Sequence, residues 1–361
     1  MGQVVERLQA AAETWVGQLG NVGVLIGIDI PGREVVHVCA GHADRECRRT
    51  AGPQHLYQIG SQTKMMTTMA GLILERQGRL SRQDRVATLL DRPDIHPDVT
   101  VEHLMMNSSG LGEFTECLIT PWFRGDAHLT PGDLVAMGLS QGQLFKPGER
   151  FDYCNTGFVL LALILERVSG RPYHEVLAEE IFQPLGMRET YVGSTGHWPR
   201  ERMASGYFRS RSVATPLDTG VCRDVAWAYG TGDVISSLAD MRRYGRALLD
   251  PANPTGISLR EMTAKRAFPS HAPKFALTLG AEYGIGIERA CWAGRPVWGH
   301  RGGTLGYGSA TWIDEEAGIV VTTCVTGVRD ITEPLDLQSL RYPGAQLFTL
   351  TLATAYQLAG L

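Results

Sequence analysis

The chain has 361 residues, of which 43% are hydrophobic and 20% are charged, as in ordinary globular proteins. Its 34 basic and 38 acidic residues leave a formal net charge of -4, so no broad positive surface is expected and nucleic acid is excluded as the main partner. No apolar run approaches the roughly 20 residues of a membrane-spanning helix. Residues 1–20 lack the pattern of a secretory signal, which predicts a cytoplasmic location.

The N-terminal part predicts a helix and a hairpin. Apolar residues recur at helical spacing over 4–19. Two β-branched runs at 22–30 and 34–40 flank Pro31-Gly32-Arg33, which is typical of two antiparallel strands and their turn. After a connection at 50–59, the apolar run 65–74 predicts a buried helix.

The middle of the chain predicts mainly helices, whereas strand patterns return near the C-terminus. Residues 209–229 show no periodicity and are predicted to form a loop, and 345–358 predicts a closing helix. Thr130-Pro131 combines a capping residue with proline at the first helical position. Helices are expected at 99–106, 130–139, 156–169, 173–181 and 232–249, and strands at 283–288, 297–300, 308–313 and 318–325.

Strands at both ends with helices between them predict an α/β fold in which helices flank an antiparallel sheet. We expect a discontinuous α/β domain formed by 1–60 and 230–361, and a mainly helical inserted region over 61–229. A cleft between the two would be the binding site. The seven cysteines show no zinc-like spacing, so we expect reduced, mostly buried thiols and no metal site.

Ser61-Gln62-Thr63-Lys64 stands at the entrance to the apolar helix. On a helix, a spacing of three places Ser61 and Lys64 on one face. A serine hydroxyl is a poor nucleophile without a base, and a lysine can serve as that base when burial lowers its pKa. This pattern makes Ser61 a candidate nucleophile and Lys64 its base, although a solvated helix start shows the same spacing.

Tyr153 and Asn155 alternate across a short extended link, so both side chains can point into one cleft. A phenol beside an ammonium would be pushed toward phenolate, which makes Tyr153 a candidate base for Ser61 and acid for the leaving group. A helix cap formed by Asn155, with Tyr153 packed behind it, is the alternative.

His300-Arg301-Gly302-Gly303 follows a predicted strand. Consecutive glycines let a backbone approach a ligand closely, and an N–H group there could form an oxyanion hole with the Ser61 N–H. His300 could donate to a substrate or to Tyr153, whereas an exposed turn histidine is the alternative.

Gly138-Leu139-Ser140-Gln141-Gly142 fits the Gly-x-Ser-x-Gly nucleophile elbow. That motif requires a strand before the serine and a helix after it. A helix is predicted before Ser140, so we reject Ser140 as the nucleophile.

The motifs Ser61-x-x-Lys64, Tyr153-Cys154-Asn155 and His300-Arg301-Gly302 resemble, in order and spacing, those of the serine β-lactamase and penicillin-binding-protein superfamily, in its class C branch. That branch includes D,D-peptidases, D-aminopeptidases, D-amino acid amidases, esterases and acyltransferases, and the stretch from 153 to 207 looks closest to the D-amino acid amidases. Segments 103–111, 145–171, 181–187 and 230–249 are also similar, so the resemblance covers roughly residues 20–330.

The resemblance implies a beta-lactamase/transpeptidase-like fold and an acyl-Ser61 intermediate. It implies that Lys64 and Tyr153 transfer protons, that Asn155 binds the substrate amide, and that the N–H groups of Ser61 and Gly303 form the oxyanion hole. His300 departs from the lysine of the common β-lactamase pattern. That departure argues against efficient antibiotic hydrolysis, because a mostly neutral imidazole replaces a fixed charge, although Arg301 could supply one.

The expected function is that of a cofactor-independent serine acyl enzyme of amidase, peptidase or esterase type. Its expected partner is a small-molecule amide or ester, such as a D-amino acid amide. A biosynthetic acyltransferase that moves an acyl group from an ester to an amine acceptor is the first alternative. A penicillin-binding sensor or a non-catalytic binding module is the second alternative.

Overall fold

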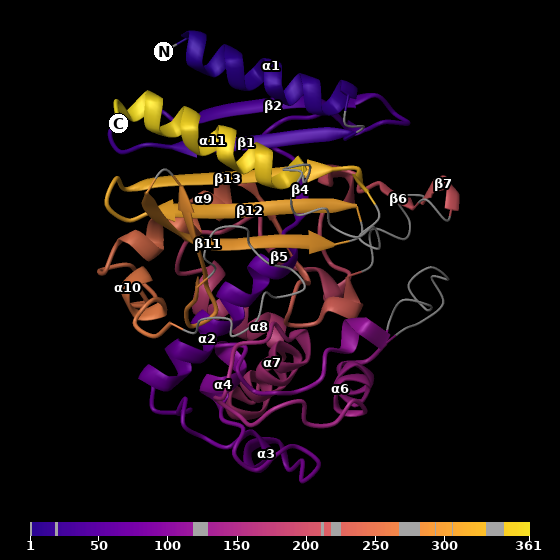
Figure 1. Cartoon of the computed structure of the whole chain (residues 1–361), viewed down its shortest axis with the longest axis vertical. Helices are drawn as coiled ribbons and strands as arrows, with labels where there is room; N and C mark the ends of the chain where they lie inside the picture. The colour runs from indigo at the N-terminus through magenta and orange to yellow at the C-terminus, as the bar shows by residue number, and fades with distance from the viewer. Residues whose placement is uncertain are drawn as a thin grey trace.

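An eight-stranded antiparallel sheet crosses the molecule (Figure 1). The computed structural model describes residues 2–18, 21–117, 129–210, 213–217, 225–266, 282–292, 294–304, 306–329 and 343–361. The strand order is β3-β2-β1-β13-β12-β11-β10-β9, so the N-terminal hairpin pairs directly with a C-terminal strand. The strands are β1 (Gly23–Asp29), β2 (Val36–Asp44), β3 (Arg49–Thr50), β9 (Glu282–Tyr283), β10 (Glu288–Trp292), β11 (Arg295–Thr304), β12 (Tyr307–Asp314) and β13 (Ile319–Thr326).

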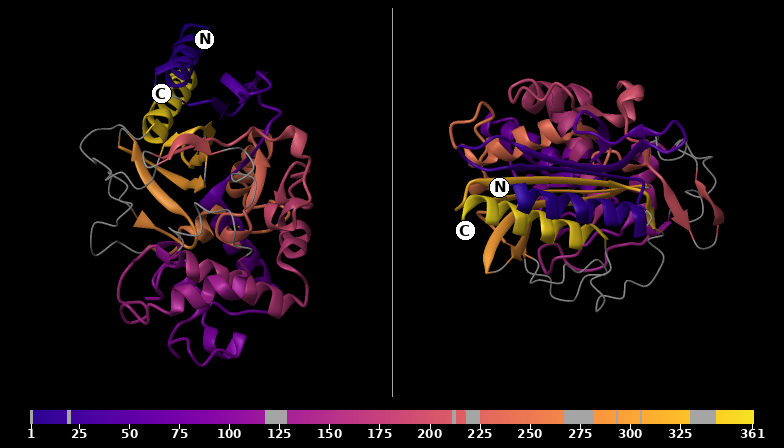
Figure 2. Two further views of the ribbon diagram at one scale, coloured as in Figure 1. Left: turned by 90° about the vertical axis from the view of Figure 1, so that its right-hand side faces the viewer. Right: turned by 90° about the horizontal axis from the view of Figure 1, so that it is seen from above.

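Helices cover both faces of this sheet, which explains why its central strands are apolar at consecutive positions. Along β1, Val24 and Ile26 pack in one core with α1 (Gly2–Gln18) and α11 (Pro343–Ala359). Leu25 lies between them in sequence and packs in the other core, which includes residues of α9 (Leu238–Leu249). The terminal helices α1 and α11 contact each other and lie on the same side of the sheet in the view from above (Figure 2).

The helices below the sheet in Figure 1 include α2 (Thr63–Arg76), which contacts strand β11 of the sheet. Residues 63–74 of α2 are all buried, as expected for a helix that is apolar on every side. Its neighbours include α7 (Asn155–Ser169), which ends at Gly170 in the left-handed conformation. The other helices are α3 (Val86–Leu90), α4 (Val101–Met105), α6 (Pro131–Leu139), α8 (Tyr173–Leu177) and α10 (Leu259–Met262), and a π-helical turn η3 (Ala178–Phe182) follows α8.

The sheet and helices confirm the predicted fold class, and the predicted start of α6 is also confirmed. Thr130 caps this helix by accepting a hydrogen bond from the N–H of Asp133, and Pro131 is its first residue. The division into 1–60 with 230–361 and 61–229 stays a proposal.

Three predictions about local structure were wrong. The strand predicted over 283–288 is interrupted at 284–287 by a turn between β9 and β10, where the Gly284 N–H donates to the Ile287 carbonyl oxygen at 2.7 Å. The region predicted as one helix over 232–249 begins with strand β8 (Val234–Ser237), which pairs with β4 (Leu56–Gln58) and β5 (Tyr191–Val192). The predicted loop at 209–229 contains β7 (Val213–Leu217), which pairs with β6 (Phe208–Ser210), and β6 also pairs with β14 (Val328–Arg329). The partners of β8, and the β14 partner of β6, are far away in the chain, whereas β7 pairs with the adjacent β6. Local periodicity does not record pairing between distant segments.

The prediction of free thiols agrees with the structure, whereas the prediction that most of them are buried was wrong. Within the described ranges the cysteines are free, yet Cys47 and Cys117 are exposed and only Cys154 and Cys324 are buried. Cys222 lies outside the described residues. No helix in the part of the chain that the structure describes is long and apolar enough to cross a membrane.

The 3-10 turn η1 (Gly60–Gln62) directly precedes α2 in the chain and packs against strand β11. Gly60 has a φ of 54°, and a Cβ atom there would lie 2.7 Å from the Gly303 nitrogen. A Cβ atom on Gly302 would lie 1.8 Å from the carbonyl oxygen of Ile59. The close approach of η1 to β11 therefore requires glycine at both positions.

We expect Gly302→Ala to lower the free energy of unfolding by about 1–3 kcal/mol, because its Cβ would overlap backbone atoms. Gly303→Ala is the matched control, since a Cβ atom there meets nothing within 4 Å. Chemical denaturation of both variants checks this expectation. Equal stability of the two variants would contradict the close contact between β11 and η1.

Candidate active site

The predicted pair Ser61 and Lys64 lies at the junction of η1 and α2. The Lys64 side chain is fully buried, and its Nζ lies 3.1 Å from Ser61 Oγ. Nζ also lies 2.7 Å from Asn155 Oδ1 and 2.9 Å from the carbonyl oxygen of Thr231. The structure thus brings three of the predicted site residues together, and Thr231 joins them.

The three partners of Lys64 differ in what they can donate. Asn155 Oδ1 and the Thr231 oxygen only accept hydrogen bonds, whereas the Ser61 hydroxyl can also donate one. A neutral amine that donates its two N–H bonds to these carbonyl oxygens directs its lone pair at the Ser61 hydroxyl. Burial lowers the pKa of Lys64 to about 7, so a large fraction of the amine is neutral near neutral pH.

Glu113 determines which way the Asn155 amide faces, and sequence analysis did not identify it. Its carboxylate accepts from the Asn155 backbone N–H at 2.6 Å and from Asn155 Nδ2 at 3.1 Å. Because a carboxylate only accepts, the amide must turn Nδ2 toward Glu113 and Oδ1 toward Lys64. The two residues lie 42 positions apart, so no local spacing could have linked them.

Tyr153 lies against the same pair of residues. Its hydroxyl forms a hydrogen bond with Ser61, and Lys64 Nζ lies 4.9 Å from the centre of its ring. Burial raises the pKa of Tyr153 well above its ordinary value. The expectation that Tyr153 would be pushed toward phenolate was therefore wrong, because loss of solvation outweighs the neighbouring positive charge.

His300 is buried and neutral rather than exposed in a turn. Its Nδ1 lies 2.5 Å from the carbonyl oxygen of Arg301, which can only accept, so Nδ1 carries the proton. Its Nε2 then accepts from the Tyr283 hydroxyl at 3.1 Å. Burial lowers the pKa of His300 to about 4. Both ring nitrogens are thus engaged, and the expected hydrogen bond from His300 to Tyr153 is replaced by the one with Tyr283.

The part of β11 that lies beside η1 contains Arg301, Gly302 and Gly303. The approach of the Gly303 nitrogen to Gly60 brings this N–H group next to Ser61, and the space on its side-chain side is open. The Nε of Arg301 lies 3.3 Å from Glu288 Oε2. Buried Glu288 therefore offsets part of the charge that Arg301 could offer a substrate.

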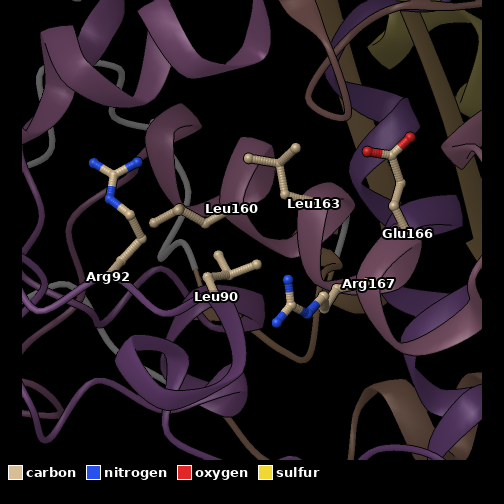
Figure 3. A pocket seen from close by; sticks show the side chains of 6 residues that line it. All are labelled: Leu90, Arg92, Leu160, Leu163, Glu166 and Arg167. Atoms are coloured by element: carbon tan, nitrogen blue, oxygen red, sulfur yellow. The ribbon is translucent and has the colours of Figure 1, made fainter.

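A surface hollow on the helical region is separate from these residues (Figure 3). Three leucines line its middle and two arginines lie beside them, while Glu166 lies at one side. Glu166 is already engaged, since its Oε1 accepts from the Tyr229 hydroxyl and the Tyr173 N–H, both at 2.8 Å. The hollow contains none of the predicted site residues; its lining is Leu90, Arg92, Leu160, Leu163, Glu166 and Arg167.

An antiparallel sheet with a Ser-x-x-Lys helix packed against one strand is the arrangement expected for a beta-lactamase/transpeptidase-like protein. The family model described as Beta-lactamase matches residues 4–346, and the chain belongs to this family. The predicted superfamily and, at the level of the family, the predicted serine hydrolase class are thereby confirmed, whereas acyltransferase activity stays a proposal.

Several characterised or solved proteins resemble the chain. A putative penicillin-binding protein PbpX of Bacillus subtilis is 31% identical over 58% of this chain and 50% of its own length. A D-aminopeptidase of Cereibacter sphaeroides is 29% identical over 88% of this chain and 59% of its own length. The chain thus spans about half to three fifths of the length of these relatives.

Two solved structures resemble the chain over most of its length. D-amino acid amidase from Ochrobactrum anthropi SV3 has a TM-score of 0.85 at 23% identity, with 99% of each chain covered. D-stereospecific amidohydrolase from Streptomyces sp. has a TM-score of 0.74 at 27% identity, and 89% of this chain and 93% of that chain are covered. At 23% identity, the likeness to the D-amino acid amidase shows a shared fold and nothing more.

The pKa of Lys64 predicts how the reactivity of Ser61 depends on pH. We expect the rate of labelling by a fluorophosphonate to rise with pH through about 7, because only the neutral amine can take the Ser61 proton. Labelling rates measured on both sides of neutrality check this. A rise only near the ordinary lysine pKa of 10.5 would contradict the effect of burial.

Proposed function

We propose that this chain is a cofactor-independent serine acyl enzyme that cleaves an amide or ester bond through an acyl-Ser61 intermediate. The observation that carries this proposal is the fully buried Lys64 amine, 3.1 Å from Ser61 Oγ, with carbonyl oxygens at its other two contacts. This arrangement suits an amine that removes a proton from a serine hydroxyl.

In the acylation step, Ser61 Oγ attacks the substrate carbonyl carbon while its proton passes to Lys64 Nζ. The carbonyl oxygen becomes an oxyanion, which would accept hydrogen bonds from the N–H groups of Ser61 and Gly303. When the intermediate collapses, the bond to the leaving nitrogen or oxygen breaks. The leaving atom takes a proton from the Tyr153 hydroxyl, and the proton held by Lys64 replaces it.

Water would then attack the acyl-Ser61 ester and give up a proton by the same route. The bond between Ser61 Oγ and the acyl carbon breaks, and Ser61 regains its proton. Asn155 would orient the Lys64 amine and bind the substrate amide. Neutral His300 has a supporting role in this scheme, since it holds Tyr283, whose ring packs edge-on against Tyr153.

The substrate class that we propose is an amide or short peptide of a D-amino acid. The likeness to D-aminopeptidases and to a D-stereospecific amidohydrolase supports it. The neutral imidazole at position 300 and the engaged Arg301 also favour such a substrate over a β-lactam, whose carboxylate would need a free positive charge.

Two alternatives use the same site. An acyltransferase would keep every step up to acyl-Ser61 and replace water with an amine. A penicillin-binding sensor or binding module would stop at the acyl-enzyme or never form it, and the name of the Bacillus subtilis relative gives that alternative some support. A cytoplasmic location, the absence of a metal or cofactor and a small-molecule partner remain predictions from the sequence.

We expect Ser61→Ala to lower turnover of a D-amino acid amide by on the order of 10³-fold or more, because the nucleophile is lost. Ser140→Ala is the matched control. Ser140 is the C-cap residue that follows helix α6, and its hydroxyl donates to the Met137 carbonyl oxygen at 2.7 Å. Turnover and mass spectrometry of the trapped acyl-peptide check both variants. Undiminished activity in Ser61→Ala, or an acyl group on Ser140, would overturn the proposal.

The competition between water and an amine separates the hydrolase from the acyltransferase. Correct orientation of an amine can be worth several kcal/mol in effective molarity, which can offset the excess of water. We expect an ester substrate with added amine to yield some amide beside the free acid. Chromatography of both products measures the partition. Rapid hydrolysis with no amide across a broad amine panel would leave only the hydrolase.

A further inference from the structure

Residues 230–234, here called the Lys64 turn, wrap around the start of the nucleophile helix. The Gly230 carbonyl oxygen accepts from Thr67 Oγ1 at 2.8 Å, and the Thr231 oxygen lies 2.9 Å from Lys64 Nζ. A Cβ atom on Gly232 would lie within 3.5 Å of Gly60, the residue before Ser61. One face of the turn thus contacts α2 and η1.

The last residue of the turn continues this contact. The Val234 N–H donates to Thr63 Oγ1 at 3.2 Å, and its carbonyl oxygen accepts from the Ile59 N–H at 3.0 Å. The position of the Thr231 oxygen, and with it the direction of the Lys64 lone pair, therefore depends on the shape of this turn.

The Asp233 carboxylate holds that shape. It is fully buried, and its Oδ1 accepts from the Gly230 N–H at 3.1 Å, which ties the fourth residue of the turn to the first. Its Oδ2 accepts from Ser194 Oγ at 2.8 Å. The Asp233 backbone oxygen accepts from the Gly193 N–H at 2.6 Å, so the turn is also fixed to the segment that follows β5.

Asp233 differs from the other buried acids of the described part of the chain. In each of the others, a carboxylate oxygen lies within 3.3 Å of an arginine side-chain nitrogen. No lysine or arginine among the described residues forms a salt bridge with Asp233. The pairs are Asp29 with Arg242 and Arg246, Asp240 with Arg243, Glu288 with Arg301, and Asp314 with Arg295.

A buried carboxylate without an ion pair lowers the stability of the fold unless something else compensates it. The turn by itself needs only a hydrogen-bond acceptor, which an asparagine would supply without a charge. The nearby Lys64 ammonium is the cation whose field acts on Asp233. After Glu113 and Glu288, which raise the pKa of Lys64 more strongly, the Asp233 carboxylate adds to the negative field around the same amine.

Several other titratable groups lie near Asp233 and Lys64 and can influence their pKa values. Asp233 faces the hydroxyls of Tyr173 and Tyr229, whose pKa values lie above the ordinary range because of burial, so both stay neutral. The groups around Lys64, besides Asp233, are Glu113, Glu288, Cys154, His300 and Tyr153.

We propose that Asp233 is a positioning residue for Lys64: it fixes the turn that presents the Thr231 oxygen, and its negative charge limits the fraction of Lys64 that is neutral. The kinetic part of this inference rests on the proposed function, because it takes Lys64 as the base for Ser61. The electrostatic part does not, since it concerns only the titration of one lysine.

The titration of Lys64 can be followed without any substrate. The chain has only four lysines, at 64, 146, 265 and 274, so ¹³C-labelled lysine gives few NMR signals, and the signal lost in Lys64→Arg identifies Lys64. Asp233→Asn keeps a hydrogen-bond acceptor and removes the charge. We expect the Lys64 midpoint to move to lower pH by about half a pH unit or more, because an ammonium loses a nearby anion.

Asp240→Asn is the matched control, because Asp240 is also fully buried but accepts from the Glu189 N–H and Thr190 Oγ1, away from the Lys64 turn. An unchanged Lys64 midpoint in folded Asp233→Asn, or an equal shift in Asp240→Asn, overturns the inference. Should Asp233→Asn not fold, Ser194→Ala replaces it. Loss of that hydrogen bond makes Asp233 easier to protonate, so the Lys64 midpoint should move in the same direction by less.

Thermal unfolding tests whether the charged form of Asp233 is disfavoured by burial, as the electrostatic part of the inference requires. Burial raises the pKa of Asp233 from 3.8 to about 7, so the stability it contributes is present below the unfolded value and is lost as pH rises through about 7. We therefore expect Asp233→Asn to gain in Tm relative to the native chain as pH rises from acid to alkaline. A constant loss of Tm at every pH would indicate a structural acid and overturn the inference.

The kinetic readout is the pH dependence of Ser61 labelling. In Asp233→Asn we expect the rise in labelling rate to move to lower pH and the rate at its plateau to fall, since the turn is less firmly held. A native chain that does not label at Ser61 would refute the proposed function and leave the NMR result standing. A native chain that labels with the same pH profile as Asp233→Asn would refute the role of Asp233 alone.

Discussion

The site depends on the burial of one amine. Lys64 enters the core on a helix that is apolar on every side, and this burial lowers its pKa to about 7. Two carbonyl oxygens accept hydrogen bonds from the N–H groups of the neutral amine, so its lone pair points at the Ser61 hydroxyl. A solvated lysine would hold its proton and could not act as a base, so the surrounding fold has to exclude water and supply these acceptors.

Each acceptor is held in place by a carboxylate, one from a distant segment and one from the same turn as its acceptor. Glu113 orients the Asn155 amide at the start of α7, and Asp233 closes the turn that carries the Thr231 oxygen. The sheet contributes the third side of the site, because glycines at 60 and 302 let the nucleophile turn lie directly against β11. Helical region, turn and sheet therefore meet at Ser61, and none of them alone could position the amine.

This arrangement has a cost in stability. A buried lysine opposes folding, and so does a buried aspartate that has no arginine partner in the part of the chain that the structure describes. The close contacts at Gly60 and Gly302 leave no room for side chains. Two apolar cores, one on each side of the sheet, offset these terms. Such exceptions to the usual pairing of buried charge are expected where a protein performs chemistry. In the proposed function, the same geometry would serve transfer to water or to an amine.

The sequence by itself determined the elements whose signal is local: the β1–β2 hairpin, the apolar α2 and α7, the capped α6, and the three-residue spacing of Ser61 and Lys64. Only the tertiary structure decided that Val234–Ser237 pairs as a strand, that Glu113 reaches Asn155, that Asp233 is buried with no arginine partner among the described residues, and that Tyr153 keeps its proton. These outcomes depend on pairing and desolvation between segments far apart in the chain. Local periodicity records neither of them, because it reports only which face of one element is apolar.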